Sequence, residues 1–207
     1  MLDKVIVQAD LALKSVVGGI STNTRQSPAA NVERSILSHQ ETAQSAKVMR
    51  VNHSGEVCAQ ALYQGQALAA KSAELEQTMN QASREEIDHL AWCEARIREL
   101  DGHTSFLNPL WYMVSFTTGM AAGFIGDRYN LGFLAATEDL VCEHLENYIE
   151  KLPKTDREGH AILLQMRLDE RKHATKAREA GAIEFSSPVK GLMRGVSKLM
   201  TLSTYHL

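Results

Sequence analysis

The sequence predicts an all-α protein, a bundle of four long helices with additional shorter helices at both ends. Only 4 prolines occur in 207 residues, and the stretches between them are rich in alanine, leucine, glutamate and glutamine, which favour helices. Turn residues divide these stretches into segments of helical length. A chain of this size can bury one sizeable core, so we expect a single bundle with terminal extensions.

The first 31 residues are expected to form a short helix and a mobile linker. Apolar residues follow helical spacing over residues 2–17, and a pair of glycines ends this segment. Residues 21–31 are rich in Ser, Thr, Asn, Gln and Pro, a composition typical of linkers. Asp3 and Asp10 interrupt any apolar run near the N-terminus, so no signal peptide is expected.

Residues 32–187 are expected to hold the four long helices. We place these helices at about 41–70, 73–100, 127–151 and 155–181. Pro153 cannot continue the third helix and therefore ends it. The run Thr155-Asp-Arg-Glu158 matches a capping box, so the fourth helix is expected to begin there.

A stretch without any charged residue, 104–126, separates the second and third helices. Its 23 residues are enough to span a bilayer, but its proline, asparagine, hydroxyl side chains and glycines are unlike a spanning helix. We expect a buried crossover, which lets the second and third helices run parallel, and in addition contact with a membrane interface. Aromatic side chains favour that zone, and the residues expected there are Phe106, Leu107, Leu110, Trp111, Tyr112, Met113 and Phe116.

Residues 188–207 carry a basic amphipathic pattern. Apolar residues recur there at spacings of three and four, and basic residues fall on another face: Val189, Leu192, Met193, Val196, Leu199 and Met200 against Lys190, Arg194 and Lys198. This pattern is typical of helices that lie on anionic lipid. A helix that packs its apolar face on a bundle shows the same pattern, so both alternatives stay open for the tail alone. Together with the uncharged crossover, the tail favours peripheral membrane contact.

The overall composition excludes two classes of protein. The formal net charge of −3 gives no electrostatic signal for nucleic-acid binding. The three cysteines, Cys58, Cys93 and Cys142, are far apart and form no CxxC pair, so we expect reduced, buried thiols. We therefore expect no nucleic-acid partner and no disulfide framework.

Two short motifs, Glu86-Ile-Asp-His89 and Glu170-Arg-Lys-His173, carry the functional prediction. Residues three apart share one face of a helix, so the carboxylate and the imidazole of each motif can point at one ion. With 17 glutamates and 8 histidines in the chain, chance alone produces roughly 0.7 such motifs. The motifs therefore need support from their positions.

Two further glutamates, Glu56 and Glu138, lie opposite the motifs in the predicted hairpins. Glu56 and Glu86 lie 15 residues on either side of the first turn, centred on residue 71. Glu138 and Glu170 lie 16 residues on either side of the second turn, centred on residue 154. At ~1.5 Å per residue, both levels are about 22–24 Å from their turns. Pairing the hairpins gathers four glutamates and two histidines around one point.

This set of donors predicts a metal centre. A single glutamate on a helix is more often on the surface, but these four lie among apolar residues at helical spacing. An ionised carboxylate on an apolar face costs several kcal/mol unless it is paired or bound to metal. Oxygen and imidazole donors suit iron or manganese, and four helices with these ligands are typical of carboxylate-bridged di-iron or di-manganese centres. Asp88, Asp139 and Asp169 adjoin the ligands and are candidates for holding the outer nitrogen of a metal-bound histidine.

The motifs and their surroundings resemble the bacterial demethoxyubiquinone hydroxylases, ferritin-like di-iron monooxygenases of ubiquinone biosynthesis. The resemblance covers residues 44–207 and is carried by Arg50-Val-Asn-His-Ser-Gly-Glu56, Arg84-Glu-Glu-Ile-Asp-His89, Ala136-Thr-Glu138 and Asp169-Glu-Arg-Lys-His173. It implies a ferritin-like four-helix bundle with a long apolar crossover. It also implies that one iron is bound by Glu56, Glu86 and His89 and the other by Glu138, Glu170 and His173, with Glu86 and Glu170 bridging.

The resemblance further implies the reaction and its partners. We expect two Fe ions per chain, O₂, and hydroxylation of the ring of a polyprenyl 3-methyl-6-methoxy-1,4-benzoquinol. The enzyme is expected at the cytoplasmic face of the cell membrane, with protein partners drawn from ubiquinone biosynthesis. His144, six residues after Glu138, matches a family histidine near the centre and is a candidate catalytic residue, although a satisfied core histidine is an equal interpretation. Three alternatives remain: a ferritin-type ferroxidase, a metal-free membrane adaptor, and a peroxide-splitting di-manganese enzyme.

Overall fold

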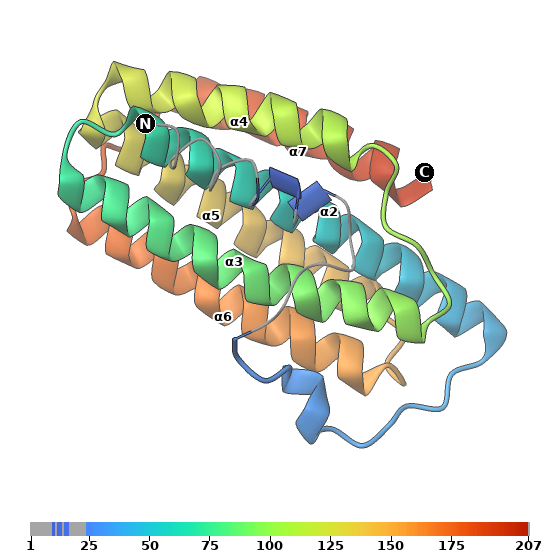
Figure 1. Ribbon diagram of the computed structural model, residues 1–207. Coiled ribbons are helices and arrows are strands. Elements are labelled where there is room, and N and C mark those ends of the chain that lie inside the picture. Colours follow the sequence, from blue (N-terminus) through green and yellow to red (C-terminus); the bar gives the residue numbers. More distant parts are fainter. Residues whose placement is uncertain (1–9, 11, 14, 17–23, 207) are drawn as a thin grey trace.

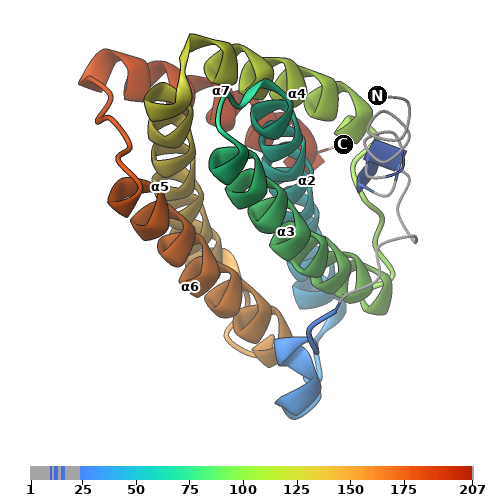
Figure 2. The same ribbon diagram turned by 60° about the vertical axis from the view of Figure 1, so that its left-hand side comes forward.

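The computed structural model describes residues 10, 12–13, 15–16 and 24–206, and these residues form helices and loops without any strand. The elements are η1 (Pro28–Asn31), α2 (His39–Ala69), α3 (Ala73–Glu99), α4 (Asn108–Ile125), α5 (Asp127–Lys151), α6 (Arg157–Glu179) and α7 (Ser187–His206). Two antiparallel hairpins, α2 with α3 and α5 with α6, pack into a four-helix bundle (Figures 1 and 2). The predicted all-α bundle is confirmed.

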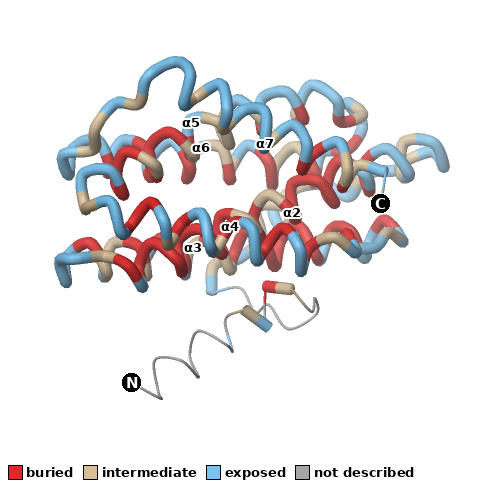
Figure 3. Tube along the Cα trace, turned by 90° about the horizontal axis from the view of Figure 1, so that it is seen from above, coloured by how far each residue is buried: buried red, intermediate tan, exposed pale blue. Residues whose placement is uncertain are grey.

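The crossover is itself a helix, α4, which lies with α7 over the side of the bundle formed by α2 and α5 (Figure 2). It returns the chain along the bundle, so that α3 and α5 run parallel, as the sequence predicts (Figure 1). Figure 3 shows buried residues along the inner sides of the bundle helices, whereas much of α7 is exposed. The four helices that carry the predicted ligands therefore surround one core, with α4 and α7 outside it.

The predicted ligands lie between two apolar clusters of that core. Each of the four bundle helices contributes residues to both clusters, as α2 does with Met49 and Tyr63. Along every helix, the predicted ligands lie between the residues of one cluster and the residues of the other, as Glu56 does in α2. Close-packed side chains on both sides of the ligand layer separate it from bulk water.

The start of α6 differs from the predicted capping box. The helix begins after Asp156, whose carboxylate accepts a backbone hydrogen bond of the first turn, and not after Thr155. The Thr155 hydroxyl instead donates to Glu41, and Glu158 accepts from the backbone of Ser35. The capping box is absent because tertiary contacts engage both of its side chains.

The N-terminal segment contacts the bundle from Thr24 onward, within the predicted linker of residues 21–31, and the mobility of this linker stays a prediction. Thr24 and Arg25 contact Asp88 of α3, and η1 follows. The linker prediction rests on polar composition, and composition gives no signal that these residues bind a carboxylate on a helix distant in sequence. Most of the predicted first helix, and residues 17–23, lie outside the described residues.

Three glycines allow α4 and α2 to approach closely. A Cβ atom at Gly65 would overlap the carbonyl oxygen of Phe116, and one at Gly119 would overlap the carbonyl oxygen of Leu62. At Gly123 an added Cβ would lie 2.6 Å from the Ala69 methyl group. Because two of these obstacles are backbone atoms, a side chain there displaces the whole helix.

Gly119→Ala is expected to destabilise the protein by about 1–3 kcal/mol, the cost of overpacking a close helix contact. Urea unfolding followed by circular dichroism measures this change. The matched control is Gly191→Ala in α7, where nothing lies within 4 Å of the added Cβ, and a gain of roughly 0.5–1 kcal/mol in helix propensity is expected. Equal stability of Gly119→Ala and wild type would contradict the close approach of α4.

Candidate metal centre

The six predicted ligands converge inside the bundle. They are all buried, with no residue more than 5% exposed: Glu56 of α2, Glu86 and His89 of α3, Glu138 of α5, and Glu170 and His173 of α6. Their ligand atoms form two groups, and within each group all of these atoms lie within 4.8 Å of one another. One group is Glu56, Glu86, His89 and Glu170, and the other is Glu86, Glu138, Glu170 and His173. Glu86 and Glu170 therefore belong to both groups.

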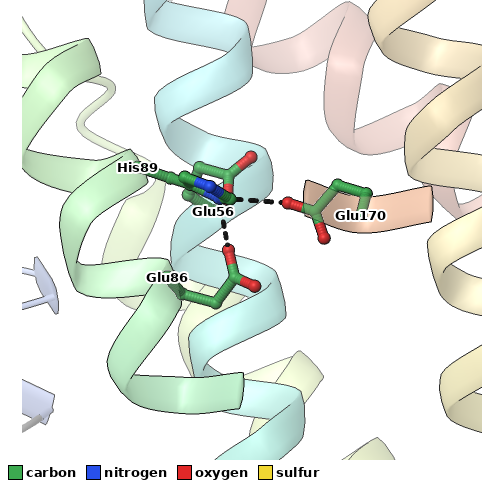
Figure 4. Close-up of side chains that lie close together, drawn as sticks. All are labelled: Glu56, Glu86, His89 and Glu170. Carbon is green, nitrogen blue, oxygen red and sulfur yellow. Dashed lines mark hydrogen bonds and ion pairs between the residues drawn. The ribbon is translucent and has the colours of Figure 1, made fainter. Parts of the chain in front are cut away.

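Both histidines turn the same ring nitrogen toward the carboxylates. Figure 4 shows the first group, in which His89 Nδ1 lies 3.0 Å from oxygens of Glu86 and Glu170. The same nitrogen lies 3.3 Å from Glu56. His173 Nδ1 lies 3.2 Å from Glu170 and 3.5 Å from Glu86. In each imidazole the Nδ1 atom faces the cluster, and the Nε2 atom faces away from it.

A carboxylate outside the cluster holds the outward nitrogen of each histidine. His89 Nε2 lies 3.3 Å from Asp169 Oδ2, so Asp169 occupies the position predicted for it. His173 Nε2 lies 2.7 Å from Glu85 Oε2, a partner that the sequence prediction missed although Glu85 directly precedes Glu86. Such carboxylates fix the tautomer and the ring orientation of metal-bound histidines.

The other two candidate partners, Asp88 and Asp139, bind arginines instead of histidines. Asp88 Oδ2 accepts a hydrogen bond from Arg25 Nε at 2.8 Å. Asp139 is exposed and pairs with Arg178. The prediction that residues adjoining the ligands hold the histidines is therefore met by Asp169 and by neither of these two.

Burial and mutual repulsion shift the protonation of the cluster. Burial raises the pKa of Glu56 well above its ordinary value, and the charge of Glu86 raises it further. Burial and the charge of Glu170 raise the pKa of Glu138 in the same way. Burial opposes the charged form of His173, but hydrogen bonds to neighbouring carboxylates outweigh it and raise its pKa to about 10. Without metal, these groups therefore keep protons at neutral pH, and bound cations would replace those protons.

Oxygen atoms of the cluster that lack a hydrogen-bond partner fit metal binding. Both carboxylate oxygens of Glu138 are buried without a hydrogen-bond partner. A buried carboxylate oxygen without a partner is costly, and a coordinated cation removes that cost. Four carboxylates and two imidazoles, without a thiolate, suit iron or manganese. The residues present therefore fit a pair of such ions.

Metal loading is expected to release protons and to weaken as the pH falls. The raised pKa values of Glu56 and Glu138, and the value of about 10 for His173, mean that an incoming cation must displace protons from these groups. The metal-bound state binds fewer protons, so acid favours the metal-free state. Titration with Co(II) over roughly two pH units around neutrality is expected to show an affinity that rises with pH. An affinity independent of pH would contradict this expectation.

His144 does not join the cluster. It lies in a groove between α5 and α7, lined also by Arg194 and Lys198, and its ring centroid is 4.4 Å from that of Tyr148. Its Nε2 atom is buried without a hydrogen-bond partner, and burial lowers its pKa to about 4. The imidazole is therefore neutral at physiological pH, and its catalytic role stays a prediction.

Comparison with known proteins shows the family to which the chain belongs. The family model described as ubiquinone biosynthesis protein COQ7 matches residues 43–204, which include all six predicted ligands. Three relatives bear the name 3-demethoxyubiquinol 3-hydroxylase: those of Ectopseudomonas mendocina (51% identical over 206 residues), Stutzerimonas stutzeri (52% over 205) and Pseudomonas aeruginosa (49% over 206). These alignments cover 99–100% of this chain and 95–96% of the relatives. By the family match and by identity over its whole length, the chain belongs to the COQ7 family of ubiquinone biosynthesis proteins.

Proposed function

We propose that this chain is a 3-demethoxyubiquinol 3-hydroxylase, which uses O₂ and a pair of iron ions to hydroxylate the ring of a polyprenyl 3-methyl-6-methoxy-1,4-benzoquinol. The observation that carries the proposal is the pair of ligand groups that share Glu86 and Glu170 inside the bundle. Family membership and the names of the relatives support hydroxylation over iron storage, peroxide splitting or a metal-free adaptor.

The positions of the residues support a role for each of them. Glu56 and His89 would hold one iron and Glu138 and His173 the other, and Glu86 and Glu170, which belong to both groups, would serve both. When bound, the iron pair supplies the O₂ chemistry of the reaction. Outside the ligands, carboxylates orient the two imidazoles through their Nε2 atoms. The apolar clusters on both sides of the ligand layer keep water from the buried carboxylates.

We further propose that the protein binds peripherally to the cytoplasmic face of the cell membrane, where a polyprenyl substrate resides. In the described part of the chain, no helix has both the length and the apolar character needed to cross a bilayer. Exposed apolar side chains instead form one stripe along α4 and the residues before it: Phe106, Leu110, Met113, Val114, Phe124 and Ile125. A second stripe follows α7: Val189, Leu192, Val196, Leu199 and Leu202. Both helices cover the same side of the bundle (Figure 2), which supports a single membrane-binding face.

The exposed stripes change the list of residues expected at the interface. The sequence prediction includes Trp111 and Tyr112, but both are only 9% exposed and pack toward the bundle. The Tyr112 hydroxyl contacts Gln64 of α2. Charge-free composition alone does not divide a helix into its inner and outer faces, so we propose the exposed residues of the stripe as the ones at the interface.

Quinone profiling tests the proposed function. Cells that lack the protein are expected to accumulate demethoxyubiquinone, and restoring the chain is expected to restore ubiquinone. Purified protein loaded anaerobically with Fe(II) is expected to hold two irons and to hydroxylate the quinol when O₂ and a reductant are supplied. Unchanged ubiquinone in the deleted cells would overturn the substrate. A large multisubunit shell in gel filtration would favour the ferroxidase, and less than one iron per chain would favour the adaptor.

A further inference from the structure

Arg25 joins the two hairpins at the seam between α3 and α6. Its Nε atom donates to Asp88 Oδ2 of α3 at 2.8 Å, and its Nη1 atom donates to Asp169 Oδ2 of α6 at 2.9 Å. Only 3% and 4% of these two aspartate side chains are exposed, against 39% for the arginine. Arg25 therefore covers two buried carboxylates from the outside, one on each hairpin.

Neighbouring contacts hold Arg25 in this position. The guanidinium carbon lies 4.9 Å from the centroid of the Trp92 ring, and Trp92 Nε1 donates to the Arg25 carbonyl oxygen at 3.3 Å. The backbone N–H of Thr24 donates to Asp88 at 2.6 Å. A planar guanidinium that divides its donors between two carboxylates fixes their relative positions, which a single ammonium group cannot do.

The carboxylate oxygen that binds Arg25 is also the oxygen that contacts His89. Asp169 Oδ2 lies 2.9 Å from Arg25 Nη1 and 3.3 Å from His89 Nε2. Fixing this oxygen therefore fixes the outward side of the imidazole and keeps Nδ1 directed at the cluster. Arg25 Nη2 also lies 3.4 Å from His89 Nε2 itself. The N-terminal segment therefore reaches one predicted metal ligand both through Asp169 and by this direct contact.

The other histidine is held differently. Glu85, the partner of His173, has 32% of its side chain exposed. Its second oxygen accepts a hydrogen bond from the neutral amide of Gln81 at 3.2 Å. The second oxygen of Asp169 likewise accepts from the Gln165 amide at 3.1 Å, and from Lys172 at 3.2 Å. The two halves of the centre therefore differ in the arginine that binds Asp169, whereas Glu85 contacts His173 and Gln81.

We propose that Arg25 is a positioning residue for the His89 half of the metal centre. The inference rests on the proposed function, since it requires that His89 binds an ion. Arg25 lies outside residues 43–204, the range that the family model matches, so the N-terminal segment adds this support to the bundle. The ion held by His89 therefore depends on Arg25, and the ion held by His173 does not.

Arg25 could act by positioning Asp169 or only by its positive charge, and these two roles predict opposite effects of its replacement on the rate of metal release. The positive charge of Arg25 repels a bound cation, so if only the charge acted, Arg25→Ala would slow metal release and Arg25→Lys would behave as wild type. If the two-pronged contact positions Asp169, both variants release metal faster, because neither can hold both aspartates. The pair of variants separates the two roles.

The experiment measures iron release from the full-length, Fe(II)-loaded protein to a ferrous chelator under anaerobic conditions. In Arg25→Ala, one of the two irons is expected to leave about 10-fold faster than in wild type, the size typical of losing an outer-sphere partner, while the other leaves at the wild-type rate. Arg25→Lys is expected to accelerate the same iron. Wild-type rates for both irons, slower release, or equal acceleration of both irons would overturn the proposal.

Two further variants control for folding and for loss of the segment as a whole. Arg157→Ala removes the pair between Arg157 and Glu33, a second contact of the N-terminal segment with α6, and is expected to leave both release rates unchanged. If Arg25→Ala does not fold, Asp88→Asn removes only the α3 anchor and is expected to accelerate the same iron; an unchanged rate there overturns the proposal. If the wild-type protein holds no iron, both the proposed function and this inference are wrong. If the wild-type protein hydroxylates the quinol and the variants release iron at the wild-type rates, only the inference is wrong.

Discussion

Replacing Glu56 or His173 with alanine is expected to abolish hydroxylation and to leave the helical bundle folded. Each substitution removes one inward ligand from one of the two overlapping groups. Loss of an outer-sphere partner typically costs 10–100-fold, so loss of a direct ligand is expected to lower turnover by more than about 100-fold. The helices persist because apolar clusters on both sides of the ligand layer pack without it.

Three measurements on each variant check this prediction. Hydroxylated quinol is measured by chromatography, bound iron by elemental analysis, and helix content by circular dichroism. The matched control is Glu150→Ala, which removes an exposed glutamate from the same helix as Glu138 and is expected to keep full activity and both irons. Retained hydroxylation in Glu56→Ala or His173→Ala would contradict the ligand assignment.

Placing glutamates on the exposed stripe of α4 is expected to weaken membrane binding by about 100-fold or more. Leu110 is 56% exposed and Met113 is 67% exposed. Transfer of such a side chain from water to an apolar phase is worth roughly 1.5–3 kcal/mol, so losing two of them accounts for the effect even if each is only partly inserted. Activity toward a water-soluble quinol analogue is expected to remain, because the substituted positions face away from the bundle.

Sedimentation with vesicles of anionic phospholipid measures the binding of the Leu110→Glu, Met113→Glu double variant. The matched control is Leu164→Glu with Leu168→Glu on α6, where the leucines are 40% and 49% exposed on the other side of the bundle (Figure 1). This control adds the same charge and removes similar exposed side chains, and it is expected to bind vesicles as wild type does. Equal binding by the α4 variant and the control would contradict a membrane-binding face at α4.

The positions of the six ligands could be predicted from the sequence because helix geometry converts residue spacing into height. Glu56 and Glu86 are equidistant from one turn, and the second hairpin repeats this arrangement. The helices are nearly continuous, so no loop of unknown shape separates a ligand from its turn. The structure accordingly gathers all six side chains into two groups with two shared members.

The carboxylates that contact the outward nitrogens of the histidines were harder to predict, because these contacts depend on which sides of two helices pack against each other. Glu85 and Asp169 each hold a histidine on a different helix, so spacing within one helix gives no signal for either contact. Arg25 lies in a polar segment whose composition resembles a linker, and only the fold brings it to the aspartates. The division of α4 into buried and exposed faces likewise follows from its packing on α2.

Magnetic spectroscopy of the iron-loaded full chain tests the shared metal centre most directly. Two irons bridged by Glu86 and Glu170 are expected to be magnetically coupled, so a one-electron-reduced sample should give the electron paramagnetic resonance signal of a coupled mixed-valent pair. Elemental analysis of the same sample is expected to show two irons per chain. Two irons without magnetic coupling, or a single iron per chain, would contradict the arrangement in which Glu86 and Glu170 are shared.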